Sequence, residues 1–311
     1  MAHCFVTREL PGAALARLAA EHELEIWPER TPPPRAELRR RAADAEGLLA
    51  LLTDPLDADL LEGCPRLRAI SNYAVGTDNV DVAAATARGI PVGNTPDVLT
   101  DSTADLAVAL MLALARRLAE AERVVREGQW LTWEPDFLLG RDLNRACVGI
   151  VGPGRIGRAV AERLAGFRCR VITASRERGG LDPLLAEADF VTVHVPLGAQ
   201  TRGMIDEREL RLMKPTAYLV NTARGPVVET GALRRALAEG WIAGAALDVT
   251  EPEPLPADDP LLSAPNLLVV PHVGSATHRT REAMAELAVA NLLAGLAGER
   301  MPHCVNPEVY G

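Results

Sequence analysis

Several features that mark nucleic-acid-binding and membrane proteins are missing from this sequence. Lys214 is the only lysine, and no block rich in Lys and Arg occurs along the chain. With a formal net charge of −9, the chain lacks the basic surface that binds a phosphate backbone, so we expect no nucleic-acid partner. The longest apolar helical stretch, residues 104–115, contains Asp105 and is too short to span a bilayer. We therefore expect no association with a membrane.

Cysteine is also scarce. The five cysteines are scattered without a C-x-x-C pair, and no histidine stands at metal-ligand spacing. This pattern predicts reduced thiols in a cytoplasmic protein, with no bound metal. The first residues also lack the charged-then-apolar pattern of a secretory signal. What is present is an ordinary globular composition, with 48% hydrophobic and 24% charged residues over 311 positions, and this length favours about two domains.

The segment around which the chain is organised is Cys147–Gly157, CVGIVGPGRIG. A β-branched apolar run leads into three glycines spaced G-x-G-x-x-G, and residues 158–164 then show the apolar spacing of a helix. In this pattern Gly152 makes the tight turn, Gly154 lets the backbone approach a pyrophosphate, and Gly157 lets the helix pack closely on the strand. The helix N-terminus adds free N–H groups and partial positive charge. The segment predicts a dinucleotide-binding site.

Strands alternate with helices along the rest of the chain, which predicts parallel sheets built from βαβ units. From residue 147 onward six strands are expected, the number that a doubly wound dinucleotide-binding sheet needs. They begin at Cys147 and continue at 170–173, 190–194, 217–220, 244–247 and 267–270. A second, smaller α/β domain is predicted before them. Its strands are expected at 4–7, 24–26, 47–53, 67–71 and 90–92.

Two long apolar helices are expected, at residues 99–118 and 276–295. Because the tail after the second helix is short, we expect this helix to return to the first domain. The predicted arrangement is a smaller domain made of residues 1–98 and 287–311. The dinucleotide-binding domain, residues 99–286, is then inserted into it.

The second strand of the dinucleotide-binding unit predicts which coenzyme is used. An acidic residue at its end would bind the ribose 2′-OH of NAD, but this strand ends in Ala174 and Ser175, and Arg176 follows. Ser175 and Arg176 can donate charge-assisted hydrogen bonds to a 2′-phosphate, each worth roughly 1.5–3 kcal/mol. Glu177 could still turn inward. The sequence therefore predicts a preference for NADP(H), with NAD(H) possible.

Six blocks in order carry a resemblance to a known family. They are NYAVGTDN (72–79), NTPDVLTDSTADL (94–106), the glycine turn, VNTARG (220–225), ALDVTEPEPL (246–255) and PHVGSAT (271–277). Together they resemble the D-isomer-specific 2-hydroxyacid dehydrogenases over essentially the whole chain. Within that family, the glyoxylate/hydroxypyruvate reductases are the most similar. This likeness is carried by TPDVLTD (95–101), the Trp130-x-x-Trp133 loop and the segments 275–281 and 291–302.

The resemblance implies an α/β fold with two doubly wound parallel-sheet domains. A Rossmann dinucleotide-binding domain would be inserted into a smaller, flavodoxin-like substrate domain. The implied activity is NADPH-dependent reduction of small 2-oxo acids, glyoxylate and hydroxypyruvate, to glycolate and D-glycerate, in a cytoplasmic homodimer. A 2-ketogluconate reductase, a phosphoglycerate dehydrogenase and a non-catalytic dinucleotide-sensing protein are the alternatives.

Reduction of a 2-oxo acid needs an anchor for the carboxylate, a proton for the carbonyl oxygen and a hydride held near the carbonyl carbon. Arg224 follows an apolar strand, and its guanidinium fork can bind the carboxylate and the carbonyl oxygen together. His272 also follows a strand and is the expected proton donor. Glu253 resembles the family's carboxylate partner of this histidine, and Glu251 is the competing candidate.

The other site residues follow from the resemblance. The backbone N–H groups of Val75 and Gly76 resemble the family's second carboxylate anchor. Trp133 lies on a loop, 129–137, that in similar reductases reaches the neighbouring subunit's substrate site; packing on its own domain is the alternative. His194 is expected as a wall of the coenzyme pocket and not as a catalyst. The expected coenzyme contacts are Thr103, Gly152, Gly154, Arg155, Ile156, Gly157, Ser175, Arg176, Val195, Pro196, Thr201, Thr222, Asp248 and Gly274.

Overall fold

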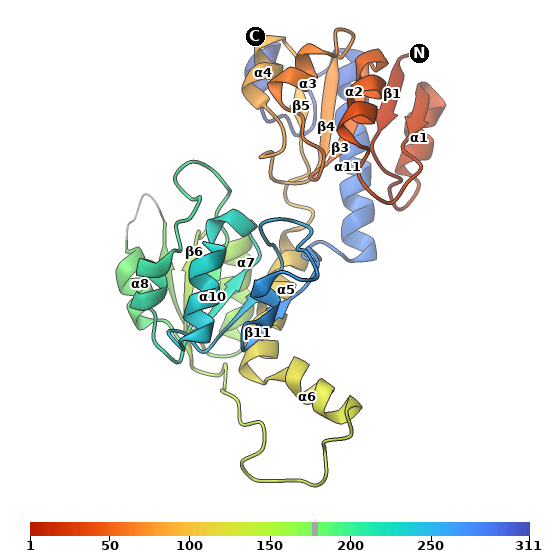
Figure 1. Ribbon diagram of the computed structural model, residues 1–311. Coiled ribbons are helices and arrows are strands. Elements are labelled where there is room, and N and C mark those ends of the chain that lie inside the picture. The colour runs from red at the N-terminus through yellow and green to blue at the C-terminus, as the bar shows by residue number, and fades with distance from the viewer. Residues whose placement is uncertain (176–179) are drawn as a thin grey trace. The chain divides into compact units, whose positions relative to one another are not determined.

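The computed structural model describes residues 1–175 and 180–311, which form two compact units (Figure 1). Unit 1 comprises Met1–Leu99 and Ala276–Gly311, and unit 2 comprises Thr100–Ser275. The second boundary lies before the predicted residue 287, because α11 (His278–Ala297) is one continuous helix of unit 1. The first half of α11 is hydrogen-bonded to unit 1, because the Tyr73 hydroxyl donates to the Arg281 carbonyl at 2.7 Å.

Unit 1 is built on a five-stranded parallel sheet with the order β2-β1-β3-β4-β5. Its strands are β1 (His3–Val6), β2 (Glu23–Ile26), β3 (Gly47–Leu51), β4 (Ala69–Tyr73) and β5 (Val92–Gly93). Its helices are α1 (Ala14–Glu21), α2 (Arg35–Asp44), α3 (Ala58–Glu62), α4 (Val82–Ala87) and α11. Phe5, Leu48 and Ile70 are fully buried in its core. This strand order is the flavodoxin-like one that the resemblance implied.

Unit 2 is built on a six-stranded parallel sheet with the order β11-β10-β9-β8-β6-β7. Its strands are β6 (Cys147–Val151), β7 (Arg170–Ala174), β8 (Phe190–Val193), β9 (Tyr218–Asn221), β10 (Gly244–Leu247) and β11 (Leu267–Val269). Its helices are α5 (Thr100–Ala115), α6 (Leu118–Arg126), α7 (Arg155–Ala165), α8 (Leu181–Glu187), α9 (Glu207–Leu212) and α10 (Thr230–Ala238). The doubly wound parallel fold is confirmed in both units.

Helices cover both faces of this second sheet because its strands are apolar on both sides. Val148 and Ile150 of β6 pack with residues of α5 and α7. Val151, on the opposite face of the same strand, packs with residues of α8, α9 and α10. Alternate residues of one buried strand thus serve two separate hydrophobic clusters.

The direction in which successive strands are added to the sheet reverses at β6. The strand that follows it, β7, lies on one side, and the next strand, β8, lies on the other. In open α/β sheets the crevice outside the carboxyl ends of the strands at such a switch point is where ligands bind. The crevice in unit 2 is therefore formed by the residues that follow β6 and β8.

The predicted helix 99–118 ends three residues earlier in the structure, at Ala115, and a second helix follows it. Helix α5 ends at Ala115, Arg117 adopts a left-handed conformation with a φ of 51°, and α6 begins at Leu118. Figure 1 shows α6 and the segment after it extending away from the sheet of unit 2. This region exposes several large apolar side chains: Leu118, Val125, Trp130, Leu131, Trp133, Phe137 and Leu139. Within the described residues, no helix combines the length and the apolar character needed to cross a bilayer.

Candidate active site

The glycine turn directly follows β6, and its geometry explains each glycine. Gly152 has a φ of +93°, and a Cβ there would lie 2.7 Å from the carbonyl oxygen of His194. A Cβ on Gly157 would lie 2.4 Å from the Gly152 carbonyl oxygen, so a side chain would push α7 away from the turn. Gly154, the N-cap of α7, has nothing within 4 Å of its Cβ position. The backbone before the free N–H groups of α7 is thus open to a phosphate.

His194, at the end of β8, contacts two threonine hydroxyls. Its Nε2 lies 2.9 Å from Thr192 Oγ1, and its Nδ1 lies 3.3 Å from Thr222 Oγ1. Burial lowers the pKa of this imidazole to about 4, so His194 is neutral at neutral pH. A neutral imidazole cannot act as a cationic acid. Through its contacts with Thr192 and Thr222, His194 links β8 to the residue that follows β9.

Thr201 shapes the loop that follows β8. Its hydroxyl donates to the Pro196 carbonyl at 2.6 Å and accepts from the Gly198 N–H at 2.9 Å. The loop therefore holds Val195 and Pro196 at the carboxyl end of the sheet, next to Gly152, whose Cβ position lies 2.8 Å from Val195 Cγ1. Coenzyme contact by these residues stays a prediction.

Three other predicted coenzyme residues come together at the end of β10. Asp248, which is 2% exposed, accepts from the Val273 N–H at 2.6 Å and from the Gly274 N–H at 2.9 Å. A Cβ on Gly274 would lie 3.0 Å from Asp248 Oδ2 and 3.4 Å from Thr103 Oγ1. Burial raises the pKa of Asp248. The Asp248 side chain thus holds the turn that follows His272.

His272 and Glu253 form a hydrogen-bonded pair, with His272 Nδ1 against Glu253 Oε1. The His272 N–H donates to the carbonyl of Asp248 at 2.9 Å, which holds the residue at a φ of +52°. The second oxygen of Glu253 accepts from the Thr250 N–H at 3.5 Å. Because Nδ1 is engaged, Nε2 is the imidazole atom left to exchange a proton with a ligand.

The competing carboxylate, Glu251, has a different partner. It forms an ion pair with Arg202 at 3.1 Å and does not contact His272. The structure therefore pairs the histidine with Glu253 and not with Glu251.

Arg224 follows β9 in a turn that the sequence did not predict. The Nδ2 of Asn221 donates to the Arg224 carbonyl at 2.9 Å, and its Oδ1 accepts from the Ala223 N–H at 3.0 Å. A Cβ on Gly225 would lie 2.0 Å from the Thr250 carbonyl oxygen, so this turn packs directly against the backbone of the Glu253 loop. Asn221 was missed, although an asparagine that ends a strand before a turn is a known turn signal.

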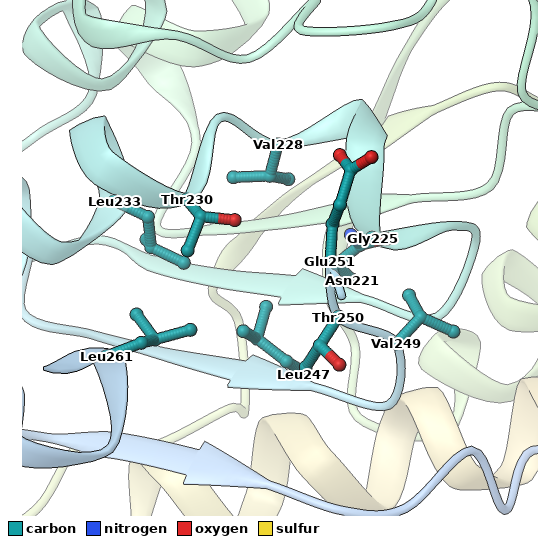
Figure 2. Close-up of a pocket in the computed structure, with 10 residues that line it drawn as sticks. All are labelled: Asn221, Gly225, Val228, Thr230, Leu233, Leu247, Val249, Thr250, Glu251 and Leu261. Carbon is teal, nitrogen blue, oxygen red and sulfur yellow. The ribbon is translucent and has the colours of Figure 1, made fainter. Parts of the chain in front are cut away.

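A small pocket opens beside this turn (Figure 2). In Figure 2 Leu233, Leu247 and Leu261 lie together, and the Glu251 carboxylate points away from them. The pocket is lined by Asn221, Gly225, Val228, Thr230, Leu233, Leu247, Val249, Thr250, Glu251 and Leu261. Gly225, the residue after Arg224, is one of its lining residues.

In unit 1 the predicted anion-binding amides follow β4. The Val75 carbonyl accepts from Asn94 Nδ2 at 2.8 Å, and the Gly76 carbonyl accepts from Asn72 Nδ2 at 2.9 Å. Within the described part of the chain, the N–H groups of these two residues donate to no acceptor. Two unpaired backbone donors in sequence are suited to bind an anion.

The remaining predicted residues are less tightly defined. Ile156 is half-buried and Arg155 is exposed in the first turn of α7, and Ser175 follows β7. Arg176 lies outside the described residues. Trp133 is 80% exposed on the segment after α6. Among residues 1–175 and 180–311, no three His, Cys, Asp or Glu side chains gather as ligands of a metal ion would.

An open glycine turn at the switch point of a doubly wound sheet, with a histidine–carboxylate pair on the same sheet edge, defines a dinucleotide-dependent oxidoreductase. The NAD-binding-domain model of the D-isomer specific 2-hydroxyacid dehydrogenases matches residues 108–274. The chain belongs to this family and is an NAD(P)-dependent oxidoreductase.

Known relatives are similar over nearly the whole chain. A glyoxylate reductase from Korarchaeum cryptofilum is 50% identical over 98% of this chain and 96% of the relative. The crystal structure of the TT0316 protein from Thermus thermophilus is 46% identical, covers 97% of this chain and 99% of that one, and superposes with a TM-score of 0.93. An NADPH-dependent glyoxylate/hydroxypyruvate reductase from Sinorhizobium meliloti, solved with NADP and malonate, is 34% identical over 98% of this chain and 97% of that one, with a TM-score of 0.85.

Proposed function

We propose that this protein reduces small 2-oxo acids, glyoxylate and hydroxypyruvate, to the 2-hydroxy acids glycolate and D-glycerate, with NADPH preferred over NADH. The observation that carries the proposal is the Glu253–His272 pair, together with the packing of the Arg224 turn against the backbone of the Glu253 loop. The half-identical glyoxylate reductase from Korarchaeum cryptofilum supports the choice of substrate.

The residues divide the chemistry among them. The guanidinium of Arg224 binds the substrate carboxylate and the carbonyl oxygen. Glu253 accepts from Nδ1 of the protonated His272, which directs Nε2 to the carbonyl oxygen. Nε2 would donate its proton to that oxygen, and a reduced nicotinamide coenzyme held at the glycine turn would supply the hydride for the 2-oxo carbon.

The glycine turn and the start of α7 would bind the pyrophosphate of the coenzyme, since Gly154 leaves the backbone open there. Thr103, Asp248 and Gly274 form the set that we assign to the nicotinamide side. Ser175 and Arg176 would bind the 2′-phosphate, because no carboxylate ends β7 to repel it. The Sinorhizobium meliloti reductase, whose structure contains NADP, supports this preference.

The coenzyme preference is tested with Ser175→Asp. The new carboxylate repels a 2′-phosphate and can accept from a free 2′-OH. The ratio of kcat/KM with NADPH to that with NADH should fall by about 10- to 100-fold, the equivalent of one or two lost charge-assisted hydrogen bonds. An unchanged ratio would remove Ser175 from the coenzyme site.

We also propose that the protein is a cytoplasmic homodimer. The exposed apolar side chains of α6 and of the following segment, with Trp133 at 80% exposure, would be covered by a second copy of the chain. Trp133 would then approach the substrate site of the partner subunit. The five unpaired cysteines agree with a reducing compartment.

The overall function is tested by a steady-state panel of 2-oxo acids, each run with NADPH and with NADH. Glyoxylate and hydroxypyruvate should consume the reduced coenzyme with the highest kcat/KM. Absence of turnover with every small 2-oxo acid would exclude the reductase and leave a non-catalytic dinucleotide-binding protein. Higher kcat/KM with 2-ketogluconate would reassign the substrate and keep the chemistry.

A further inference from the structure

Asn221 is a fully buried amide that ends β9, with 0% of its surface exposed. Its Nδ2 donates to the Arg224 carbonyl and its Oδ1 accepts from the Ala223 N–H. Its own carbonyl accepts from the Asp248 N–H at 2.9 Å, which joins it to β10. Each end of the side-chain amide thus has a partner of the matching kind, and a reversed amide would face a donor with a donor.

These two hydrogen bonds hold the peptide group before Ala223 and the peptide group after Arg224, so both residues lie between two fixed points. The Arg224 Nη1 also donates to the Ala223 carbonyl at 2.9 Å, so the guanidinium itself is tied to this backbone. On the far side, Gly225 packs against the Thr250 carbonyl, and the pocket shown in Figure 2 leaves free space beside the turn. The direction of the Arg224 side chain therefore depends on the Asn221 amide.

We propose that Asn221 is a positioning residue for 2-oxo acid reduction: it fixes the Ala223–Arg224 backbone so that the guanidinium fork meets the substrate carboxylate. The inference rests on the function proposed above, because it assigns Asn221 a task through Arg224. A misplacement of about 1 Å in a substrate-positioning group can cost on the order of 100-fold in rate. We therefore expect a change at Asn221 to lower kcat/KM more, when expressed as a free energy, than it lowers the free energy of unfolding.

The test is Asn221→Asp in the full chain. Aspartate has the same shape and still accepts from the Ala223 N–H, but it places an oxygen against the Arg224 carbonyl where a donor stood. We expect kcat/KM for glyoxylate to fall about 10- to 100-fold, mostly through KM. The Kd for NADPH should change by less than about twofold, since the glycine turn is untouched.

Asn306→Asp is the matched control. Asn306 is 1% exposed, accepts from the Val92 N–H and donates to the Ile90 carbonyl, and it contacts none of the candidate site residues. The same chemical change should lower Tm and leave kcat/KM unchanged. An equal loss of kcat/KM in both variants would show a general folding defect and overturn the inference.

A double-mutant cycle with Arg224→Lys, which keeps the charge and removes the fork, tests whether Asn221 acts through Arg224. Asn221→Asp should cost less than about twofold in the Arg224→Lys background, since coupled residues are not additive. Full additivity, or wild-type kcat/KM in Asn221→Asp, would overturn the inference while the reductase stands. A wild-type protein that does not reduce glyoxylate would overturn the proposed function, and the inference with it.

Discussion

Two glutamates placed two positions apart have separate tasks because their side-chain partners differ. Arg202 binds Glu251, whereas His272 binds Glu253. The sequence placed both carboxylates in one loop, and the spacing from Asp248 together with the following Pro254 favoured Glu253 over Glu251. Asp248, which follows β10, accepts hydrogen bonds from the N–H groups of His272 and Val273, which follow β11. These bonds bring the loop that carries Glu253 next to His272.

His272→Ala is expected to lower kcat by about 10²- to 10⁴-fold, the usual contribution of a general acid. The Kd of NADPH should be nearly unchanged. Glu251→Gln is the control, because it alters the neighbouring carboxylate that pairs with Arg202, and it should keep kcat within about threefold. Wild-type turnover in His272→Ala would remove this residue from the mechanism.

His194 predicts a dependence of stability on pH. Its pKa is about 4 in the folded protein, against about 6.5 in an unfolded chain. Between these values the unfolded chain binds a proton that the folded chain does not. The free energy of unfolding should therefore fall as pH is lowered from 6.5 towards 4, by roughly 1–3 kcal/mol from this residue.

The measurement is denaturant unfolding of the wild type and of His194→Asn at pH 7 and at pH 4.5. The variant lacks the titrating group, so the stability difference between the two proteins should shrink at the lower pH. A difference that is the same at both pH values would show that the pKa of His194 is the same in the folded and the unfolded chain.

At the scale of elements, the strands followed from the sequence because each is a short apolar run between turn residues. All of the predicted strands occur in the structure, with ends that differ by one or two residues. The predicted end of the helix 99–118 was wrong, because α5 ends at Ala115 and Arg117 takes a left-handed conformation that no residue pattern predicts. The separate helix α6 and its exposed apolar face were consequently missed.

The glycine turn gives a prediction at this scale. Gly157→Ala places a Cβ 2.4 Å from the Gly152 carbonyl, so α7 must shift away from the turn. We expect a loss of about 1–3 kcal/mol in the free energy of unfolding, together with weaker coenzyme binding.

Gly154→Ala provides the contrast. Its Cβ position is open, so Tm should change little while the Kd for NADPH rises, because the methyl group occupies the approach of the pyrophosphate. If Gly154→Ala binds NADPH normally, the phosphates do not pass over this residue.

At the scale of the whole molecule, the chain folds into two units whose segments are interleaved in sequence. Residues after 275 belong to the same unit as residues 1–99, and α11 is fastened to it by the Arg17–Glu286 ion pair at 2.9 Å and by the Tyr73 hydroxyl. The sequence predicted this insertion from the short tail. It placed the return to unit 1 at residue 287, inside a helix that is continuous from 278.

The proposed homodimer is tested with Leu131→Asp combined with Trp133→Asp. These side chains are 87% and 80% exposed, so charges there should not unfold the chain but should disrupt an apolar interface. Sedimentation velocity should show a dimer for the wild type and a monomer for the variant. Leu262→Asp, at a side chain that is 45% exposed in another part of unit 2, should remain dimeric; a monomeric wild type would refute the assembly.

The sequence by itself determined the order of strands and helices, the glycine turn and the family, because these depend on local residue patterns and on motifs read in order. Tertiary structure alone decided which strands are neighbours, and it brought Glu253 against His272 and Gly225 against the Thr250 carbonyl. Those contacts join residues from different strand ends, and only the parallel packing of β9, β10 and β11 brings these ends together.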